Sequence, residues 1–411
     1  MDVKLKTCLD IMLLIFLILW PAVDTLNGYL HYQQIGISSV SAPYKALGFI
    51  GVVLMLLVYH PKCFFQLLVV ISLAAICIAY HYFIYNGSAE SVVWLVRALL
   101  TLALIFYLVS ESSRGSFWSR RKLAGLMLLY FVVMSANVVL GMFGIGETQY
   151  AGGIGGKGFI IAGNEMSYLM LASASIVLIY LAEHKSFLIL TSAFLVLLFF
   201  FLMKATKVAM LGICLAYLYA LVFGGYFTVR RIPVIYICSL FGAVAALMLG
   251  YQFVQATGLL DRMLFLYQLH GGFWGALLSG RVTFVQDAFN QLVIDFGFLD
   301  VFFGVGVGQL LTIRGSLVEI DLVDVFIAFG IVGPLVFYFP WMLLVKWSMA
   351  LMAHSPKEGL SFMLLAITLI GVSLTAGHVV NSGIASSVTA FLVSYMYMTK
   401  EIRSSRQGDV V

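Results

Sequence analysis

Long apolar runs make up most of the chain, and polar residues gather in the short segments between them. Each run is close to the length of about 20 residues that a helix needs to cross a bilayer. The twelve runs are residues 9–25, 44–59, 64–84, 91–109, 123–142, 158–182, 187–203, 206–224, 233–252, 322–346, 359–377 and 380–398. They lack the alternating period of barrel strands, so the pattern predicts an all-α polytopic transmembrane helix bundle of about 12 spans.

The composition excludes a soluble protein. Of the 411 residues, 63% are hydrophobic and 10% are charged, whereas soluble domains carry roughly 25% charged residues. We therefore expect residues 1–411 to form a single integral membrane domain. The five cysteines lie in or beside apolar runs without the spacing of metal ligands, so they are interpreted as small core residues.

Lysine and arginine are distributed unequally between the two sides of the predicted bundle. Fifteen lie on the side of both termini, seven on the other side, and Arg97 lies inside a span. Because basic residues accumulate on the cytoplasmic side, this bias predicts that both termini are cytoplasmic.

One connection, residues 253–318, is much longer than the others and lies between spans 9 and 10. From Arg281 to Phe296 its apolar residues recur every three or four positions, with Ala288 and Leu292 on one face. This period predicts an amphipathic helix within a large external, periplasmic loop. Gly153 to Gly158 match a dinucleotide-binding fingerprint, but with no strand expected before them they are interpreted as a loop that leads into a helix.

Basic residues near the external side are candidates for binding an anion. Lys204 and Lys207 stand between two apolar runs, where lysines that reach the headgroups and lysines that bind an anion are about equally good interpretations. Arg281 opens the amphipathic helix, and it either anchors that helix to lipid phosphates or forms a phosphate site with the helix N-terminus. Arg314 borders the same loop.

Carboxylates gather at two further places. Glu319, Asp321 and Asp324 enter the tenth run, where the helix dipole explains part of the pattern, although three acids exceed what capping requires. Asn164 and Glu165 lie in the sixth run. A buried Glu165 needs a partner, for which Arg97 or Lys157 is available, and a structural ion pair is a somewhat better interpretation than catalysis.

Cations and carboxylates that border one external loop suit the transfer of a group from a phosphate leaving group. Cations neutralise a departing pyrophosphate, and a carboxylate accepts the proton of an attacking hydroxyl.

The order of several motifs resembles that of the O-antigen polymerase and O-antigen ligase superfamily, over roughly residues 158–335. The motifs are Gly163-Asn164-Glu165, Thr206-Lys207, Ser279-Gly280-Arg281, Phe303-Gly304-Val305-Gly306-Val307-Gly308 and Ala328-Phe329-Gly330-Ile331-Val332-Gly333. The resemblance implies a GT-C-like, all-helical glycosyltransferase of the bacterial inner membrane. Such an enzyme takes glycan from an undecaprenyl pyrophosphate carrier on the periplasmic side, without a metal, nucleotide sugar or other cofactor. Lys207 and Arg281 match the basic residues of the family.

The ligases carry a His-Asn pair where this sequence has Glu319-Ile320, and an acidic group there looks more like the polymerases. The leading hypothesis is a polymerase that joins lipid-linked repeat units of O-antigen, capsule or exopolysaccharide. Arg281 and Lys207, with Lys204 and Arg314, would bind pyrophosphate. Glu319, or else Asp321 or Asp324, would orient or deprotonate the acceptor hydroxyl.

Two alternatives remain: a ligase that transfers glycan to lipid A core, and a flippase or transporter of lipid-linked glycan. A chain-length regulator and a flippase are expected partners beside the lipid-linked oligosaccharide and the bilayer, and no nucleic acid is expected.

Overall fold

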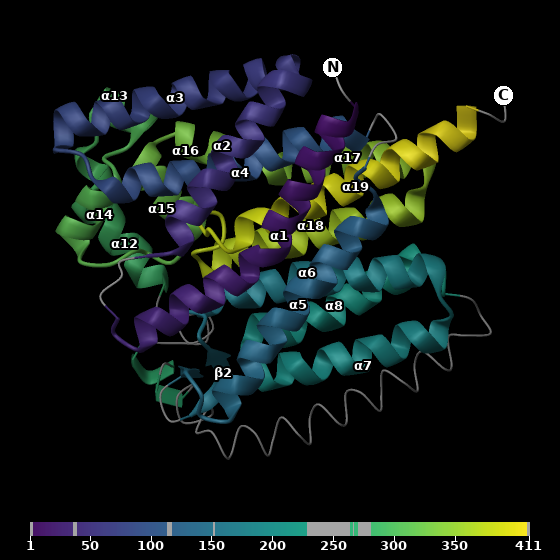
Figure 1. Ribbon diagram of the computed structural model, residues 1–411. Helices are drawn as coiled ribbons and strands as arrows, with labels where there is room; N and C mark the ends of the chain where they lie inside the picture. The colour runs from purple at the N-terminus through teal and green to yellow at the C-terminus, as the bar shows by residue number, and fades with distance from the viewer. Residues whose placement is uncertain are drawn as a thin grey trace.

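A computed structural model describes residues 3–35, 39–112, 117–150, 153–227, 264–265, 267–269 and 281–408. The elements in the first part of the chain are α1 (Val3–Tyr32), α2 (Ser41–Tyr59), α3 (Pro61–Tyr85), α4 (Ala89–Ser112), α5 (Arg120–Met142), β1 (Glu147–Tyr150), β2 (Ile154–Gly158), α6 (Gly163–His184), α7 (Phe187–Lys204) and α8 (Lys207–Phe223). Those that follow are α12 (Arg281–Gln291), the 3-10 helix η1 (Val293–Asp295), α13 (Phe298–Phe303), α14 (Val307–Arg314), α15 (Asp321–Phe329), α16 (Val332–Phe337), α17 (Phe339–His354), α18 (Pro356–Ala376) and α19 (Ala385–Gly408). Figure 1 shows how these helices pack into one bundle, with both chain termini at the same end.

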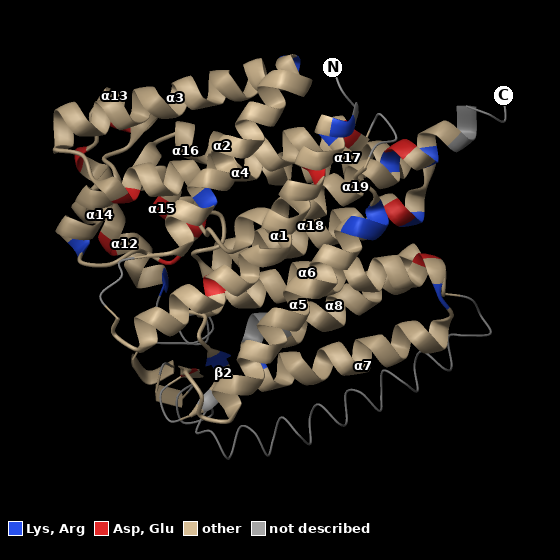
Figure 2. Cartoon of the chain, in the orientation of Figure 1, with Lys and Arg blue, Asp and Glu red and all other residues tan. Residues whose placement is uncertain are grey.

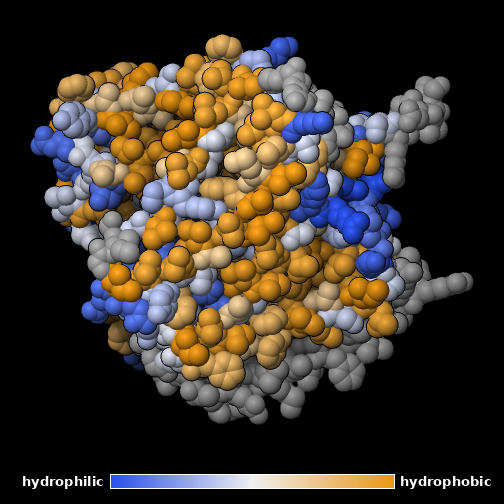
Figure 3. Space-filling model, in the orientation of Figure 1, coloured by the Kyte–Doolittle hydropathy of each residue, from blue (hydrophilic) through white to orange (hydrophobic). Residues whose placement is uncertain are grey.

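Eight helices of the described part are long and apolar enough to cross a membrane, namely α1 to α7 and α18. They confirm an all-α polytopic membrane protein and correspond to eight of the twelve expected spans. The expected span 206–224 is α8, a shorter helix of 17 residues, and the expected span 233–252 lies outside the described residues. Figure 3 shows that apolar side chains cover most of the visible face between the charged regions, as lipid contact requires.

The expected span at 322–346 is wrong, because this segment contains the three helices α15, α16 and α17 in place of one. Helix α15 ends at Gly330, whose φ of +58° and ψ of −147° fit no helix. Pro340 then lies in the first turn of α17, the position in a helix where proline is tolerated. The polar start of α15 therefore opens a helix of nine residues rather than a long span.

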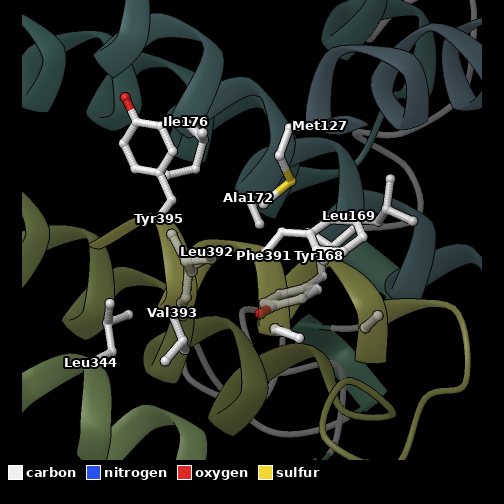
Figure 4. Packing of buried hydrophobic residues seen from close by; sticks show 14 of the residues in the cluster. Met127, Tyr168, Leu169, Ala172, Ile176, Leu344, Phe391, Leu392, Val393 and Tyr395 are labelled. Atoms are coloured by element: carbon white, nitrogen blue, oxygen red, sulfur yellow. The ribbon is translucent and has the colours of Figure 1, made fainter. Parts of the chain in front are cut away.

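Helix α19 begins at Ala385, five residues later than expected, so residues 377–384 form a connecting loop in place of a tight turn. The helix packs against α4, α5, α6 and α17 and is buried along most of its length. Its polar side chains therefore face the bundle interior, as in the hydrogen bond of 2.9 Å between the hydroxyls of Thr389 and Tyr168. Figure 4 shows the apolar part of this core, to which α6 contributes Leu169, Ala172 and Ile176, and α19 contributes Phe391, Leu392 and Tyr395.

The segment between α5 and α6 contains a short antiparallel hairpin, in which Thr148 pairs with Gly156 and Tyr150 with Ile154. The expectation that no strand precedes the glycine run is wrong, since β1 precedes it. The hairpin is not part of a parallel βαβ unit, so the dinucleotide fingerprint lacks the context that it requires.

Charged residues concentrate at two opposite ends of the bundle, as Figure 2 shows. At the end with the termini, Arg120 pairs with Glu183 at 2.8 Å, and Arg403 pairs with Glu358 at 2.6 Å. The second concentration surrounds α12, α14 and α15. The candidate site residues near these three helices thus lie far from the chain termini.

Candidate functional site

Arg281 and Glu319 form an ion pair at the start of α12. The Nη2 atom of Arg281 donates to Glu319 Oε2 at 2.8 Å, and Nη1 donates to the backbone carbonyl of Thr375 at 2.7 Å. A longer bond of 3.4 Å joins Nη2 to the carbonyl of Ala376. Because both carbonyls belong to the last turn of α18, the guanidinium also satisfies groups that a helix C-terminus leaves unpaired.

Glu319 is the accessible partner of this pair. Its side chain is 44% exposed, against 13% for that of Arg281. Its backbone adopts a left-handed conformation with φ of +63°, which is unusual for a residue with a side chain. A strained residue that presents a half-exposed carboxylate is a candidate for function.

Asp324 stabilises the left-handed backbone conformation of Glu319. Its carboxylate accepts hydrogen bonds from the backbone N–H groups of Val318 at 2.7 Å and Glu319 at 3.0 Å. The Asp324 residue is 1% exposed. Both carboxylate oxygens of Asp324 therefore bind the backbone next to Glu319. This geometry is that of a residue that positions Glu319.

Asp321 is also buried, at 2% exposure. Its Oδ2 atom accepts from the Ser373 hydroxyl at 2.8 Å and from the backbone N–H groups of Val379 and Val380 at 2.9 and 3.1 Å. This carboxylate thereby ties α15 to α18 and to the 377–384 loop. Asp321 and Asp324 both lie in the first turn of α15, but they bind different backbone segments: Asp321 binds residues 379 and 380, and Asp324 binds residues 318 and 319.

The first turn of α6 reaches the same loop from another direction. Asn164 donates to the carbonyl of Ala376, the group that Arg281 also contacts. Glu165 accepts a hydrogen bond from the Ser382 hydroxyl. Glu165 lies in the first turn rather than several residues into a span, because α6 begins at Gly163.

Arg97 completes this convergence from α4. Its Nη1 atom donates to the backbone carbonyl of Asn381 at 3.1 Å. The other partner considered for Glu165, Lys157, instead pairs with Glu147 within the β-hairpin at 2.6 Å. Residues of α4, α6, α12 and α15, which are distant in sequence, therefore meet at Ala376 and the 377–384 loop, where the hydropathy pattern predicts only a tight turn.

The other basic residues expected to bind pyrophosphate, Lys204, Lys207 and Arg314, are not seen to join Arg281 at one site. Lys204 is fully buried at 0% exposure and donates to the side-chain oxygen of Gln149. Lys207 begins α8, but its side chain lies outside the described part of the structure, as do Ser279 and Gly280. Arg314 ends α14, where it contacts the carbonyl of Ser316 and the ring of Phe284 instead of Glu319.

Two glycine motifs position α15 for this arrangement. Val305 and Gly306 donate backbone hydrogen bonds of 3.0 Å to the carbonyls of Ile327 and Ala328. A Cβ at Gly304 would lie 2.4 Å from the carbonyl carbon of Ala328, so only glycine permits this approach. The glycine motif at residues 303–308 therefore packs directly against the motif at residues 328–333.

The amphipathic helix expected after Arg281 is confirmed as α12, with Ala288 at 0% exposure. Ala288 and Leu292 pack in a small separate core, together with Val305, Leu310, Val318 and Ile327. Asp287 lies on the exposed face. This packing holds Arg281 at the end of a fixed helix.

Lys45 and Asp24, which were not among the residues expected at the site, form an ion pair of 2.6 Å close to Arg97 and Glu165. Both lie inside predicted spans or at their edges, and charged residues at that depth are unusual. That rule, applied to Asp24 as it was to Arg97, would have identified the pair.

A search of curated proteins found no match to this chain. Residues 273–403 match the model of a family described as O-antigen ligase like membrane protein, which agrees with the O-antigen polymerase and ligase superfamily and supports a membrane enzyme that processes glycans.

Proposed function

We propose that this protein is a polymerase that joins undecaprenyl-pyrophosphate-linked oligosaccharide repeat units into O-antigen, capsular or exopolysaccharide chains. The observation that carries the proposal is the Arg281–Glu319 pair of 2.8 Å, in which the carboxylate is half exposed and held in a left-handed conformation. Both residues lie within the segment that matches the family model.

In the proposed reaction, the acceptor hydroxyl attacks the anomeric carbon of the donor glycan while the bond to pyrophosphate breaks. Glu319 accepts the hydroxyl proton, and the pyrophosphate leaves with the bonding electrons and needs no general acid. The reaction as proposed is metal-independent. Asp321 and Asp324 act by holding the loops around Glu319, since their oxygens already accept backbone hydrogen bonds.

Arg281 has two roles in this scheme. In the structure its Nη2 atom holds Glu319, and an arriving pyrophosphate, with more negative charge, would compete for the same guanidinium. Transfer of Arg281 from Glu319 to the donor would free the carboxylate to act as a base only when donor is present. Lys204, Lys207 and Arg314 remain proposed contributors to the same anion site.

We further propose that residues 253–318 form a periplasmic loop within a single membrane domain and that both termini are cytoplasmic. The proposal is supported by the position of the termini at the end opposite α12 and α15 (Figure 1). The membrane would be the bacterial inner membrane, where the lipid-linked donor resides. A chain-length regulator and a flippase of the same pathway are proposed as partners.

A ligase that transfers glycan to lipid A core is the second candidate, because the matching family model is described as ligase-like. A deletion strain separates the two. Loss of a polymerase leaves lipopolysaccharide with at most one repeat unit, whereas loss of a ligase leaves core with none. Restored long chains on re-expression of the wild type, but not of Glu319→Gln, support the polymerase. Core without any repeat unit in the deletion strain would contradict it.

A further inference from the structure

A pocket of about 540 Å³ lies beside the 377–384 loop, with Gly383 and Ile384 in its lining and neither Arg281 nor Glu319 among the lining residues. Its lining comes from α1, α2, α4, the first turn of α6 and the loop, and it includes Asp24, Lys45, Arg97, Glu165 and Gly383. This volume is within the range of about 300–1,000 Å³ that small-molecule sites occupy. None of the roles proposed above uses the pocket.

The cationic groups of Lys45 and Arg97 both lie next to Gly383. A Cβ built on this glycine would lie 3.1 Å from Lys45 Nζ and 3.3 Å from Arg97 Nε. Gly383 has no left-handed backbone angle, so the missing side chain matters for the space that it leaves between the two cations. A larger residue would fill the point where an anionic oxygen could contact both.

The lining contains the cations Lys45 and Arg97 and the carboxylates Asp24 and Glu165, and Glu165 interacts electrostatically with both cations. Lys45 is bound to Asp24 Oδ1 at 2.6 Å, and Glu165 is hydrogen-bonded to Ser382. Arg97 makes no ion pair within the described residues, although it lies inside a membrane span. A charged side chain at this depth is costly, so Arg97 is a candidate for binding a ligand.

Apolar side chains form the outer part of the same pocket. Val92, Val93 and Ile161 line it and are 43%, 37% and 44% exposed. Arg97 is the ninth residue of α4, about 12 Å along the axis from its start at a rise of 1.5 Å per residue. The pocket therefore offers cations a short distance below the headgroup level and an apolar wall beside them, which suits a phosphate that carries a long hydrocarbon chain.

We propose that this pocket binds the phosphate of a second lipid-linked glycan, between Lys45 and Arg97, while the Arg281–Glu319 pair serves the reacting centre. The inference rests on the proposed function, since a polymerase must hold two lipid-linked substrates at once. The span from Ala376 to Gly383 is seven residues, which extends at most about 25 Å. One loop thus borders both sites.

The test uses the full-length protein in detergent micelles and, as a probe, undecaprenyl phosphate with a photoreactive diazirine beside the phosphate. Mass spectrometry of the cross-linked peptides then locates the label. We expect it within residues 39–46 and 92–100. We expect Arg97→Gln and Gly383→Val each to reduce labelling there by at least tenfold, with Arg97→Lys intermediate because it keeps the charge.

Lys157→Gln is the matched control, because Lys157 is an external cation that is already paired with Glu147 outside the pocket. We expect its labelling to stay within twofold of the wild type. Thermal unfolding of each variant in detergent checks that the fold is retained, and Gly383→Ala supplies a smaller obstruction if Gly383→Val does not fold. Labelling of the pocket that is unchanged in both Arg97→Gln and Gly383→Ala would overturn the inference.

Inorganic pyrophosphate as competitor tests whether the lipid chain matters. If it displaces the probe no better than chloride at equal ionic strength, the site recognises a lipid-linked phosphate. Displacement at the same concentration as unlabelled undecaprenyl phosphate would show a site for free phosphate and contradict the proposal. The binding assay requires no turnover, so its result is independent of the chain-length test of polymerase activity.

Discussion

Arg281 and Glu319 are 38 positions apart in the sequence and lie 2.8 Å apart in the structure, between Nη2 and Oε2. The pair joins the first residue of α12 to the loop before α15, and the same guanidinium reaches the last turn of α18. One side chain therefore connects three elements, and its partner carboxylate stays half exposed.

Glu319→Gln is expected to abolish long polysaccharide chains, because the amide keeps the size of the side chain but cannot accept the acceptor's proton. Loss of a general base reduces rates by about 10² to 10⁴. The measurement is the chain-length ladder of a complemented deletion strain, with membrane levels checked by immunoblotting. A normal ladder from Glu319→Gln would rule out this residue as the base.

Arg281→Lys is expected to impair polymerisation nearly as much as Arg281→Ala. Arg281 uses two terminal nitrogens on different partners, Thr375 and Glu319, whereas lysine offers a single charged nitrogen. The assay is the same ladder. Full activity of the lysine variant would show that charge alone suffices.

Asp324→Asn is expected to lower stability, because its carboxylate accepts two backbone N–H groups while almost completely buried. The amide can accept at only one of its two positions, so one donor loses its partner at a cost of about 1–3 kcal/mol. Thermal unfolding in detergent measures the effect. Asp287→Asn on the exposed face of α12 is the control and should unfold like the wild type.

Gly304→Ala is expected to reduce the amount of folded protein. Gly304 has φ of +71°, and an added Cβ would meet the backbone of Ala328 at 2.4 Å. Gly371→Ala is the matched control, since a Cβ there meets nothing within 4 Å, and a helical alanine is preferred over glycine. Fluorescence-detected size-exclusion chromatography compares the two, and equal monodisperse yields would contradict the proposed contact.

Glu183→Gln is expected to lower thermal stability without changing the polysaccharide ladder. Glu183 bridges Arg120 and Arg403 at the end of the bundle that holds the termini, and that end takes no part in the proposed reaction. A shortened ladder at normal protein levels would show that this end influences activity.

The sequence alone determined the helical membrane fold, because continuous apolar runs leave a chain in a bilayer no other way to satisfy its backbone. It also determined the buried face of α12, since the residues on that face follow the helical period. Arg281, Glu319 and the two aspartates could be proposed as site residues from the sequence because charges are scarce in this chain. Gly330 and Pro340 in the tenth run were visible signals of its break, but the hydropathy of the run concealed them.

Only the tertiary structure decided which of these charges meet. The 377–384 loop is short and mostly uncharged, yet its backbone groups form hydrogen bonds with the side chains of Asp321 and Arg97. Arg281 binds the carbonyl of Ala376, the residue just before the loop. Backbone carbonyls and N–H groups occur at every residue, so no sequence pattern marks the ones that a distant side chain will bind. Helix packing decides that the Glu319 side chain is half exposed while Asp321 and Asp324 are buried. It also decides that Lys45 and Arg97 lie next to Gly383.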